Sequence, residues 1–356
     1  MSSALLKLSD FSNKILNWYD NCGRHDLPWQ QHPTVYRVWI SEIMLQQTQV
    51  STVIPYYHRF MQRFPDVSVL ALADVDEVLH LWSGLGYYSR ARNLHRTAAI
   101  VVNEYQGVFP ETVEELQKLP GIGRSTAGAI LSLGLNQPHP VLDGNVKRVL
   151  CRYNSIKGWP GSGPVEKQLW TLAGQLLSVD RPAAYTQAIM DLGATVCVRS
   201  FPLCNDCPVS PGCLACKQGL QNELPHKREK KKPPVKQLHF IMIEGADGEI
   251  LLQKRPPAGI WGGLWGFPEC PLETDLVSWV HEKFGYSVNS ITYEPELKHT
   301  FTHFQLRINP VRMRLESAPA GIRDSDDLYW FKPGGSNKTL GMAAPVKKLI
   351  ENVFLK

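Results

Sequence analysis

The chain has no run of 18 or more apolar residues, so no membrane-spanning helix is expected. Met1–Asp10 lacks the long apolar core that directs secretion, and the cysteines are therefore expected to stay reduced. Charge of one sign is also scarce, because the net charge of the 356 residues is only +5. This balance permits a nucleic-acid partner without requiring one. A chain of this length can bury large cores, which disfavours a fold that depends on disulfides.

Four cysteines are present in one short segment with the spacing C-x6-C-x2-C-x5-C, namely Cys197, Cys204, Cys207 and Cys213. Their thiolates can supply every ligand of a cubane iron–sulfur cluster or of a tetrahedral zinc ion. A second pattern, Cys204-x2-Cys207 followed by Cys213-x2-Cys216, has the form of a cramped zinc knuckle, whose pairs are usually separated by a longer loop. The spacing predicts a metal site and favours iron–sulfur, but it leaves zinc open.

A basic, proline-rich linker is predicted at residues 226–236, where charge and proline leave little that can pack. Residues 1–225 are predicted to form an all-α domain, and residues 237–356 a smaller α+β domain. The predicted helices of the first domain are Val35–Gln49, Val67–Leu72, Val75–Leu81, Arg90–Glu104, Thr112–Lys118, Arg124–Leu133 and Val165–Leu177. In the second domain, strands are predicted at Leu238–Ile243, Ile250–Lys254 and within Thr300–Leu315, and a helix at Leu276–Phe284.

A glycine-rich turn, Leu119-Pro-Gly-Ile-Gly-Arg-Ser-Thr-Ala127, lies between two predicted helices. Gly121 and Gly123 permit a tight turn that exposes backbone N–H groups at the start of a helix, which is a natural anion site. Such a turn can hold a DNA phosphate without reading sequence. A plain connection between helices explains the same pattern.

Two carboxyl groups are candidates for catalysis. Asp143 stands before Gly-Asn-Val at a predicted helix start, where its position by itself favours a helix N-cap. Helical spacing places Glu42 on one face with Trp39, Gln46 and Gln49. A carboxyl group in an aromatic pocket acquires a raised pKa, but an exposed position on the surface explains the pattern equally well.

Four motifs together resemble those of the helix–hairpin–helix DNA glycosylases. They are Ser41-Glu-Ile-Met-Leu-Gln-Gln-Thr-Gln49, Leu119-Pro-Gly-Ile-Gly-Arg124, Val141-Leu-Asp-Gly-Asn-Val146 and the cysteine spacing. Leu85-Gly-Tyr-Tyr-Ser-Arg-Ala-Arg-Asn93 narrows the resemblance to the MutY-type adenine DNA glycosylases. The resemblance extends from Trp18 to Cys213 and continues more weakly to the C-terminus. It implies two α-helical lobes with the active site between them, and one [4Fe–4S] cluster on the four cysteines that supports DNA binding.

The resemblance also implies the chemistry, which is hydrolysis of the N-glycosidic bond of adenine mispaired with 8-oxoguanine or guanine, leaving an abasic site. Adenine must leave the duplex for this, and its ring must be protonated. Glu42 matches the general acid, and Asp143 the carboxylate that stabilises the oxocarbenium-like sugar. Asn145 is expected to position Asp143 or the sugar. Ser125 stands where related lyases carry a lysine, so no efficient strand-cleaving step is expected.

Further positions are expected to contact DNA. Tyr87 matches the tyrosine that wedges beside the oxidised guanine, and Gln47 matches a glutamine at the same stack. Gln46 is expected to contact DNA together with Gln47. Arg90 and Arg92 are predicted to be phosphate contacts or surface charges.

The C-terminal domain resembles a Nudix fold of the MutT-like kind. Gly262-Gly-Leu-Trp-Gly-Phe-Pro-Glu269 echoes the loop before a Nudix box, but Asp275–Gly285 lacks the clustered glutamates of the box. Magnesium-dependent pyrophosphate hydrolysis is therefore not expected. Phe301, Thr302 and His303 match a Phe-Ser-His loop that senses 8-oxoguanine, with threonine in place of serine.

The sequence thus predicts a bacterial, cytoplasmic, nucleoid-associated monomer that acts on double-stranded DNA containing A:8-oxoguanine or A:G mispairs. A rival hypothesis is an endonuclease III-like glycosylase with lyase activity, which Ser125 and the C-terminal domain oppose. A second rival is a non-catalytic iron–sulfur protein that marks lesions, which the pairing of Glu42 with Asp143 opposes.

Overall fold

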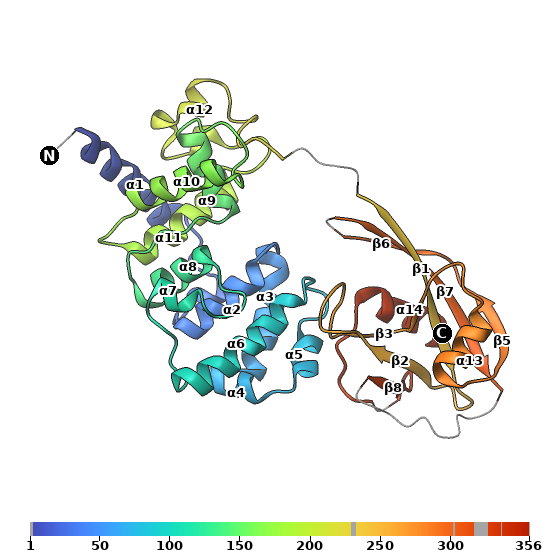
Figure 1. Cartoon of the computed structure of the whole chain (residues 1–356). Helices are drawn as coiled ribbons and strands as arrows, with labels where there is room; N and C mark the ends of the chain where they lie inside the picture. Colours follow the sequence, from blue (N-terminus) through green and yellow to red (C-terminus); the bar gives the residue numbers. More distant parts are fainter. Residues whose placement is uncertain (1–2, 229–232, 302, 317–326, 336, 356) are drawn as a thin grey trace. The chain divides into compact units, whose positions relative to one another are not determined.

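The computed structural model describes residues 3–228, 233–301, 303–316, 327–335 and 337–355. The chain separates into two compact units. We call Met1–Leu72 with Asn93–Glu229 the helical unit, and Ala73–Arg92 with Lys230–Lys356 the sheet unit. Figure 1 shows helices throughout the first and a strand-rich fold in the second. The predicted all-α domain and α+β domain are confirmed, but the short segment Ala73–Arg92 groups with the C-terminal residues.

The helical unit holds most of the helices. They are α1 (Ser3–Cys22), α2 (Val35–Leu45), α3 (Val50–Arg63), α4 (Val67–Leu72), α6 (Ser89–Tyr105, which begins in the sheet unit), α7 (Val113–Leu116), α8 (Arg124–Leu135), α9 (Gly144–Tyr153), α10 (Gly163–Gln175), α11 (Pro182–Asp191) and α12 (Leu214–Lys217). The predicted bounds of α4 are confirmed. No described helix has the length and apolar character needed to cross a bilayer.

Helix α2 is shorter than its sequence pattern predicts. It starts after Thr34, whose hydroxyl accepts a hydrogen bond from the Arg37 N–H (3.2 Å), and it ends at Leu45 instead of Gln49. Gln47 has a φ of 57°, in the left-handed region that an α-helix does not tolerate. The loop between α2 and α3 therefore presents the glutamine side chains that the pattern assigned to a helix face.

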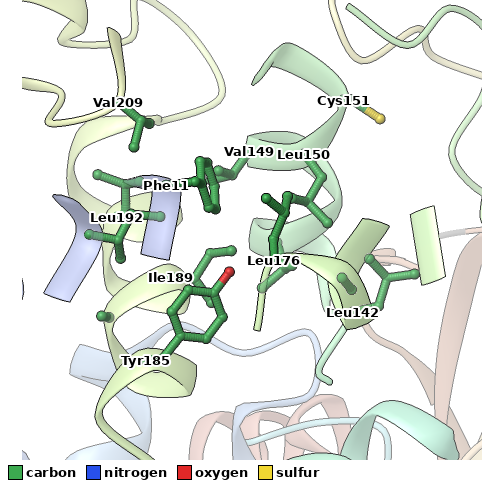
Figure 2. Close-up of a cluster of buried hydrophobic side chains, with 14 of the residues drawn as sticks. Phe11, Leu142, Val149, Leu150, Cys151, Leu176, Tyr185, Ile189, Leu192 and Val209 are labelled. Carbon is green, nitrogen blue, oxygen red and sulfur yellow. The ribbon is translucent and has the colours of Figure 1, made fainter. Parts of the chain in front are cut away.

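Side chains of α1, α9 and α11 form an apolar core (Figure 2). Val149 and Leu150 of α9 pack with Ile189 of α11, and Phe11 of α1 belongs to the same cluster. Leu142, which directly precedes Asp143, is also part of it. The core therefore fixes the position at which Asp143 begins α9.

In the described residues of the sheet unit, eight strands form one sheet. The elements of this unit are α5 (Val75–Leu81), β1 (Val235–Glu244), β2 (Ile250–Lys254), β3 (Trp265–Gly266), β4 (Glu269–Cys270), α13 (Leu276–Phe284), β5 (Val288–Tyr293), β6 (Leu297–Thr300), β7 (Gln305–Leu315), β8 (Leu328–Phe331) and α14 (Ala344–Phe354). The strand order is β3-β2-β1-β7-β5, with β4 on β1, β6 on β7 and β8 on β2. The predicted bounds of β2, α5 and α13 are confirmed.

The centre of the sheet is the parallel pair of β1 and β7, in register from Val235↔Gln305 to Glu244↔Arg314. Ile241 and Ile243 share a buried cluster with Val280 of α13, so this helix covers one face of the sheet. Strand β1 begins within the predicted linker, of which residues 229–232 lie outside the described part of the chain. The predicted strand region Thr300–Leu315 is interrupted between β6 and β7, and Phe301 and His303 lie in that turn.

Candidate active site

A cavity of about 800 Å³ opens in the helical unit. Its walls come from α2, the loop after α2, the start of α8 and the start of α9. The predicted site residues that line it are Glu42, Gln46, Gln47, Ser125, Asp143 and Asn145. Segments about a hundred residues apart in sequence thus meet around one space.

Glu42 projects from α2 into this cavity. Burial is the main cause, and the nearby charge of Asp143 the second cause, of a rise in the pKa of its carboxyl group from 4.5 to about 8. At neutral pH the folded chain therefore holds Glu42 largely as a carboxylic acid, which can donate a proton.

Asp143 is the N-cap of α9, as its position predicts. Its Oδ1 accepts a hydrogen bond from the Val146 N–H (2.7 Å), and its Oδ2 accepts one from Asn145 Nδ2 (3.2 Å). Burial raises the pKa of Asp143, while these hydrogen bonds oppose the rise by stabilising the carboxylate. Capping also orients the carboxyl group at the cavity wall, so the two interpretations of this residue are compatible.

Asn145 connects the carboxyl group to an arginine that sequence reasoning missed. Arg148 donates to Asn145 Oδ1 (2.8 Å) and, through Nε, to the carbonyl oxygen of Cys197 (2.7 Å). It also donates to the Gly193 carbonyl (2.6 Å). Only the spacing of Asn145 and Arg148 on one helix could have indicated the first of these contacts.

Ser125 ties the start of α8 to the segment that precedes α9. Its hydroxyl oxygen accepts a hydrogen bond from the Leu142 N–H (3.1 Å), one residue before Asp143. The neighbouring Thr126 hydroxyl accepts a hydrogen bond from Gln46 Nε2 (3.3 Å). The hydroxyl groups of Ser125 and Thr126 therefore connect the start of α8 to the segment before Asp143 and to the loop after α2.

A partly buried ion pair beside the cavity was also not predicted from the sequence. Arg24 donates to Asp191 from Nε (3.0 Å), from Nη2 (2.5 Å) and from its backbone N–H (2.8 Å). Gln187 Nε2 donates to the same carboxylate (2.8 Å). Arg24 and Gln187 line the cavity, while Asp191 is fully buried. Because Arg24 and Asp191 are 167 residues apart, no local pattern could have paired them.

The glycine-rich turn joins α7 to α8. Gly121 has a φ of 82°, and a Cβ atom there would lie 3.0 Å from the Cβ of Asn93. Gly123 is the N-cap of α8, with a φ of −89° and open space around its Cα. The space around Gly123, at the start of α8, is therefore open, which an anion site at a helix N-terminus requires.

The four cysteines of the C-x6-C-x2-C-x5-C motif line a second cavity of the helical unit, together with Cys216. Arg152 is 2% exposed and donates to the Cys197 Sγ (3.3 Å) and to the Val198 carbonyl (2.7 Å). A positive charge is thus buried beside the sulfur atoms. Among the described residues, no three His, Cys, Asp or Glu side chains gather closely enough to hold a single metal ion.

Cys216 also lies beside this motif. Burial is the main cause, and the neighbouring Cys216 thiol the second cause, of the rise in the pKa of the Cys204 thiol to about 11. In the sequence, Cys216 appears only in the pattern of a cramped zinc knuckle. The structure places it in the wall of the cavity that the four motif cysteines line.

The sheet unit contains a cavity of about 530 Å³ that brings together other predicted residues. Tyr87, Phe301 and His303 line it with Trp261 and His299. The Phe301 ring lies 5.2 Å from Trp261 and 4.7 Å from His299, measured between ring centroids. Thr302 lies outside the described residues.

Tyr87 and Gln47 share an unusual backbone conformation. Their φ values are 49° and 57°, and both side chains are exposed. Non-glycine residues adopt this region at a cost, and such strained positions are enriched at functional sites. Arg90, predicted as a phosphate contact or surface charge, is instead 8% exposed and donates to the carbonyl groups of Leu85 and Gly86, which stabilises the loop that carries Tyr87.

Comparison with known proteins first defines the class. The family model described as HhH-GPD superfamily base excision DNA repair protein matches residues 40–175, and the NUDIX domain model matches residues 239–352. A solved structure of a thermostable thymine-DNA glycosylase is 26% identical with a TM-score of 0.55, covering 61% of this chain and 100% of that one. The chain is a base excision DNA repair protein with a C-terminal Nudix domain.

Two relatives then define the family. The adenine DNA glycosylase of Buchnera aphidicola subsp. Acyrthosiphon pisum (strain APS) is 40% identical over 342 residues, which are 96% of this chain and 97% of that protein. The adenine DNA glycosylase of Homo sapiens is 37% identical over 387 residues, with 89% of this chain and 70% of that protein covered. The chain belongs to the adenine DNA glycosylase family and is an N-glycosylase of base excision repair, so the predicted family and activity are confirmed.

Proposed function

We propose that this enzyme removes adenine mispaired with 8-oxoguanine or guanine in double-stranded DNA. Glu42 protonates the flipped adenine at N7 and then helps to activate water, and Asp143 stabilises the oxocarbenium-like sugar. The observation that carries this assignment is the presence of both carboxyl groups at one cavity, with the pKa of Glu42 raised to about 8. One group then serves as an acid and the other as a carboxylate, as glycosidic bond cleavage requires.

The reaction ends at the abasic site. A serine hydroxyl at position 125 cannot form an imine with the sugar, which lyases form through a lysine amine. Ser125 instead supports the segment before Asp143 through the Leu142 N–H, and Asn145 orients the Asp143 carboxylate. Both are positioning residues in this proposal.

DNA contacts extend over both units. The turn at Gly121 and Gly123 binds a backbone phosphate through the N–H groups of α8. Gln46 and Gln47 contact the duplex beside the flipped base, and Tyr87 wedges next to the oxidised guanine. The exposed, left-handed positions of Gln47 and Tyr87 support the last two roles.

The sheet unit senses the oxidised guanine through Phe301, Thr302 and His303. Aromatic rings around a cavity offer stacking surfaces to a base, and His303 adds a polar edge. Magnesium-dependent hydrolysis is not part of this proposal, because residues 275–285 lack the clustered glutamates of a Nudix box.

A [4Fe–4S] cluster is proposed for Cys197, Cys204, Cys207 and Cys213, where it supports DNA binding. The fit rests on the shared cavity and on the buried guanidinium of Arg152, which offsets the negative charge of four thiolates. Each thiolate of a cubane binds its own iron, so the ligands need not converge as they do on one zinc ion. We further propose domains at residues 1–225 and 237–356 with a linker at 226–236, and a monomer that works on DNA in the bacterial cytoplasm.

An excision assay tests the catalytic assignment. Wild-type protein should release adenine opposite 8-oxoguanine and leave a strand that breaks only after alkali. Glu42→Gln should lower the single-turnover rate by roughly 10²–10⁴-fold, the usual contribution of a general acid, while duplex binding is retained. Glu111→Gln, which removes an exposed charge, is the matched control. Unchanged excision by Glu42→Gln would remove Glu42 as the acid.

A discrimination assay tests the sensor. His303→Ala should reduce the preference for A:8-oxoguanine over A:G by roughly tenfold, the equivalent of about one hydrogen bond. The rate on A:G should change little, because excision itself takes place at Glu42. His281→Ala, an exposed histidine on α13, controls for the loss of an imidazole. An unaltered ratio of the two rates means that this loop does not sense the lesion.

A further inference from the structure

Two cations face each other across the hairpin formed by β6 and β7. Lys298 of β6 is directly opposite Arg307 of β7 in the antiparallel register. Side chains in such a pair have Cβ atoms about 4.5–5.5 Å apart, and like charges there destabilise a sheet. The hairpin therefore holds two positive charges together at a cost, which an anion bound between them offsets. We call Lys298 and Arg307 the cation pair.

The cation pair has little compensation from carboxylates of the chain. Arg314, on the same strand, donates to Glu244 (3.0 Å). In the part of the chain that the structure describes, Arg307 has no such ion pair, and its buried Nε lacks a hydrogen-bond partner. Lys298 lies 3.6 Å from a carboxylate oxygen of Glu296, but its side chain is 59% exposed. An exposed pair of this kind contributes little, so both cations are available to an external anion.

The cation pair lies on a sheet face that is only partly covered. Even-numbered residues of β7 are buried from Leu306 to Pro310, and odd-numbered residues from Val311 to Leu315. Helix α13 packs against the second set. Because side chains alternate along a strand, Arg307 is on the same face as that second set, further along β7, and it remains partly exposed. Figure 1 shows β6 at the end of the sheet away from α13.

The hairpin also fixes the cation pair relative to the proposed sensor. The Phe301 N–H donates to the Phe304 carbonyl (2.9 Å), and the two rings stack with centroids 4.4 Å apart. The pair of Thr300 with Gln305 closes the strands, and the cation pair lies two residues further from the turn, about 7 Å along the strand. A DNA strand carries one phosphate per roughly 3.4 Å of helix axis. A phosphate within about two nucleotides of a base at Phe301 can therefore reach the cation pair.

We propose that Lys298 and Arg307 bind a backbone phosphate of the DNA strand that carries 8-oxoguanine, close to the lesion. This inference rests on the proposed sensor role of Phe301 and His303. The Arg307 guanidinium offers a fork of donors to two phosphate oxygens, and Lys298 adds a point charge. Phosphate contacts position a strand without reading its bases. Loss of the cation pair therefore weakens binding to damaged and undamaged duplexes alike, whereas loss of the sensor changes the preference between them.

Binding to a duplex with 8-oxoguanine opposite a stable abasic analogue tests the contact without excision. When salt is varied, the slope of log K against log salt should be shallower by about 0.9 in Lys298→Gln/Arg307→Gln than in wild type, because one phosphate contact is lost. Affinity should fall by roughly 3–10-fold, by the same factor when guanine replaces 8-oxoguanine. Arg314→Gln/Lys348→Gln removes two exposed positive charges of the same unit and should keep the wild-type slope. An unchanged slope in the first variant, or an equal change in the second, overturns the phosphate contact.

A second measurement locates the phosphate with wild-type protein and so does not depend on the folding of a variant. Methylphosphonate groups remove the charge of one phosphate at a time. In the strand with 8-oxoguanine, one substitution within about two nucleotides of the lesion should weaken wild-type binding several-fold and leave the affinity of Lys298→Gln/Arg307→Gln unchanged. No sensitive phosphate near the lesion, or one only on the adenine strand, overturns the proposal. His303→Ala should respond to the substitution as wild type does, so a failure of the sensor assignment is distinguished from a failure of the cation pair.

Discussion

At the scale of single residues, the chemistry of Glu42 is set by its surroundings and not by its type. A carboxyl group in water would be ionised at neutral pH. Burial at the cavity wall and the neighbouring Asp143 raise its pKa to about 8. The same burial acts on Asp143, but the Val146 and Asn145 donors oppose it there. The hydrogen bonds at Asp143 lower its pKa, whereas no hydrogen bond is among the causes of the shift at Glu42, so the two carboxyl groups respond differently to burial.

The raised pKa of Glu42 makes a prediction about stability. The folded chain binds this proton up to a pH of about 8, whereas the unfolded chain releases it near 4.5, so stability from Glu42 is present below 4.5 and is lost as pH rises through 8. Glutamine does not titrate, so the Glu42→Gln variant does not lose stability in this way. The melting temperature of the variant minus that of wild type should therefore increase between pH 5 and pH 9, by roughly 2 °C or more.

Calorimetry across this pH range measures the difference, with Glu111→Gln as the control for loss of an exposed carboxyl group. A melting-temperature difference that does not change with pH would show that Glu42 has an ordinary pKa. The rate of excision should fall over the same alkaline range, because the acid form of Glu42 is then depleted.

At the scale of elements, the site depends on how helices begin and end. Thr34 starts α2, and the left-handed Gln47 follows its end, so Glu42 faces the cavity while Gln46 and Gln47 lie in a loop. Asp143 starts α9. Sequence patterns placed α4, α5 and α13 correctly, because the apolar spacing of these short helices is interrupted by clear breaks. The apolar spacing also predicted that α2 continues to Gln49, because nothing in that spacing indicates the turn at Gln47.

The turn between α7 and α8 gives a prediction at this scale. Gly121→Ala should lower the free energy of unfolding by roughly 2–3 kcal/mol, because alanine is strained at a φ of 82° and its Cβ would meet Asn93. Gly123→Ala should cost at most about 1 kcal/mol, the usual penalty for alanine at an N-cap. Thermal unfolding of the full chain compares the two, and a larger loss for Gly123→Ala would contradict the conformation described for this turn.

At the scale of the whole molecule, the chain is not divided in simple sequence order. Ala73–Arg92 interrupts the helical unit and belongs to the sheet unit. Asp76 on α5 accepts hydrogen bonds from Lys254 Nζ (3.0 Å) and Trp265 Nε1 (3.2 Å). His80 contacts the Leu340 carbonyl through Nδ1 (3.1 Å). The loop that carries Tyr87 is thereby attached to the unit that carries Phe301.

This attachment can be tested at Asp76. Asp76→Ala should lower the stability of the sheet unit by roughly 1–3 kcal/mol, because Lys254 and Trp265 each lose an acceptor at a partly buried position. Proteolysis within residues 73–92 should become faster. Glu273→Ala, which removes an exposed carboxylate of the same unit, is the control. If the two variants behave alike, this ion pair does not hold the segment in place.

The sequence by itself determined the family, the two fold classes and the identity of the candidate site residues. It could do so because local spacing encodes helices and strands, and because Glu42, Asp143 and the cysteines lie in short motifs of unusual composition. Only the tertiary structure decided how these motifs meet, through contacts between residues far apart in the chain. The ion pair of Arg24 with Asp191 and the hydrogen bond from Arg148 to the Cys197 carbonyl are of this kind. The tertiary structure also decided the burial of Glu42, because distant segments of the chain form the cavity walls that raise its pKa.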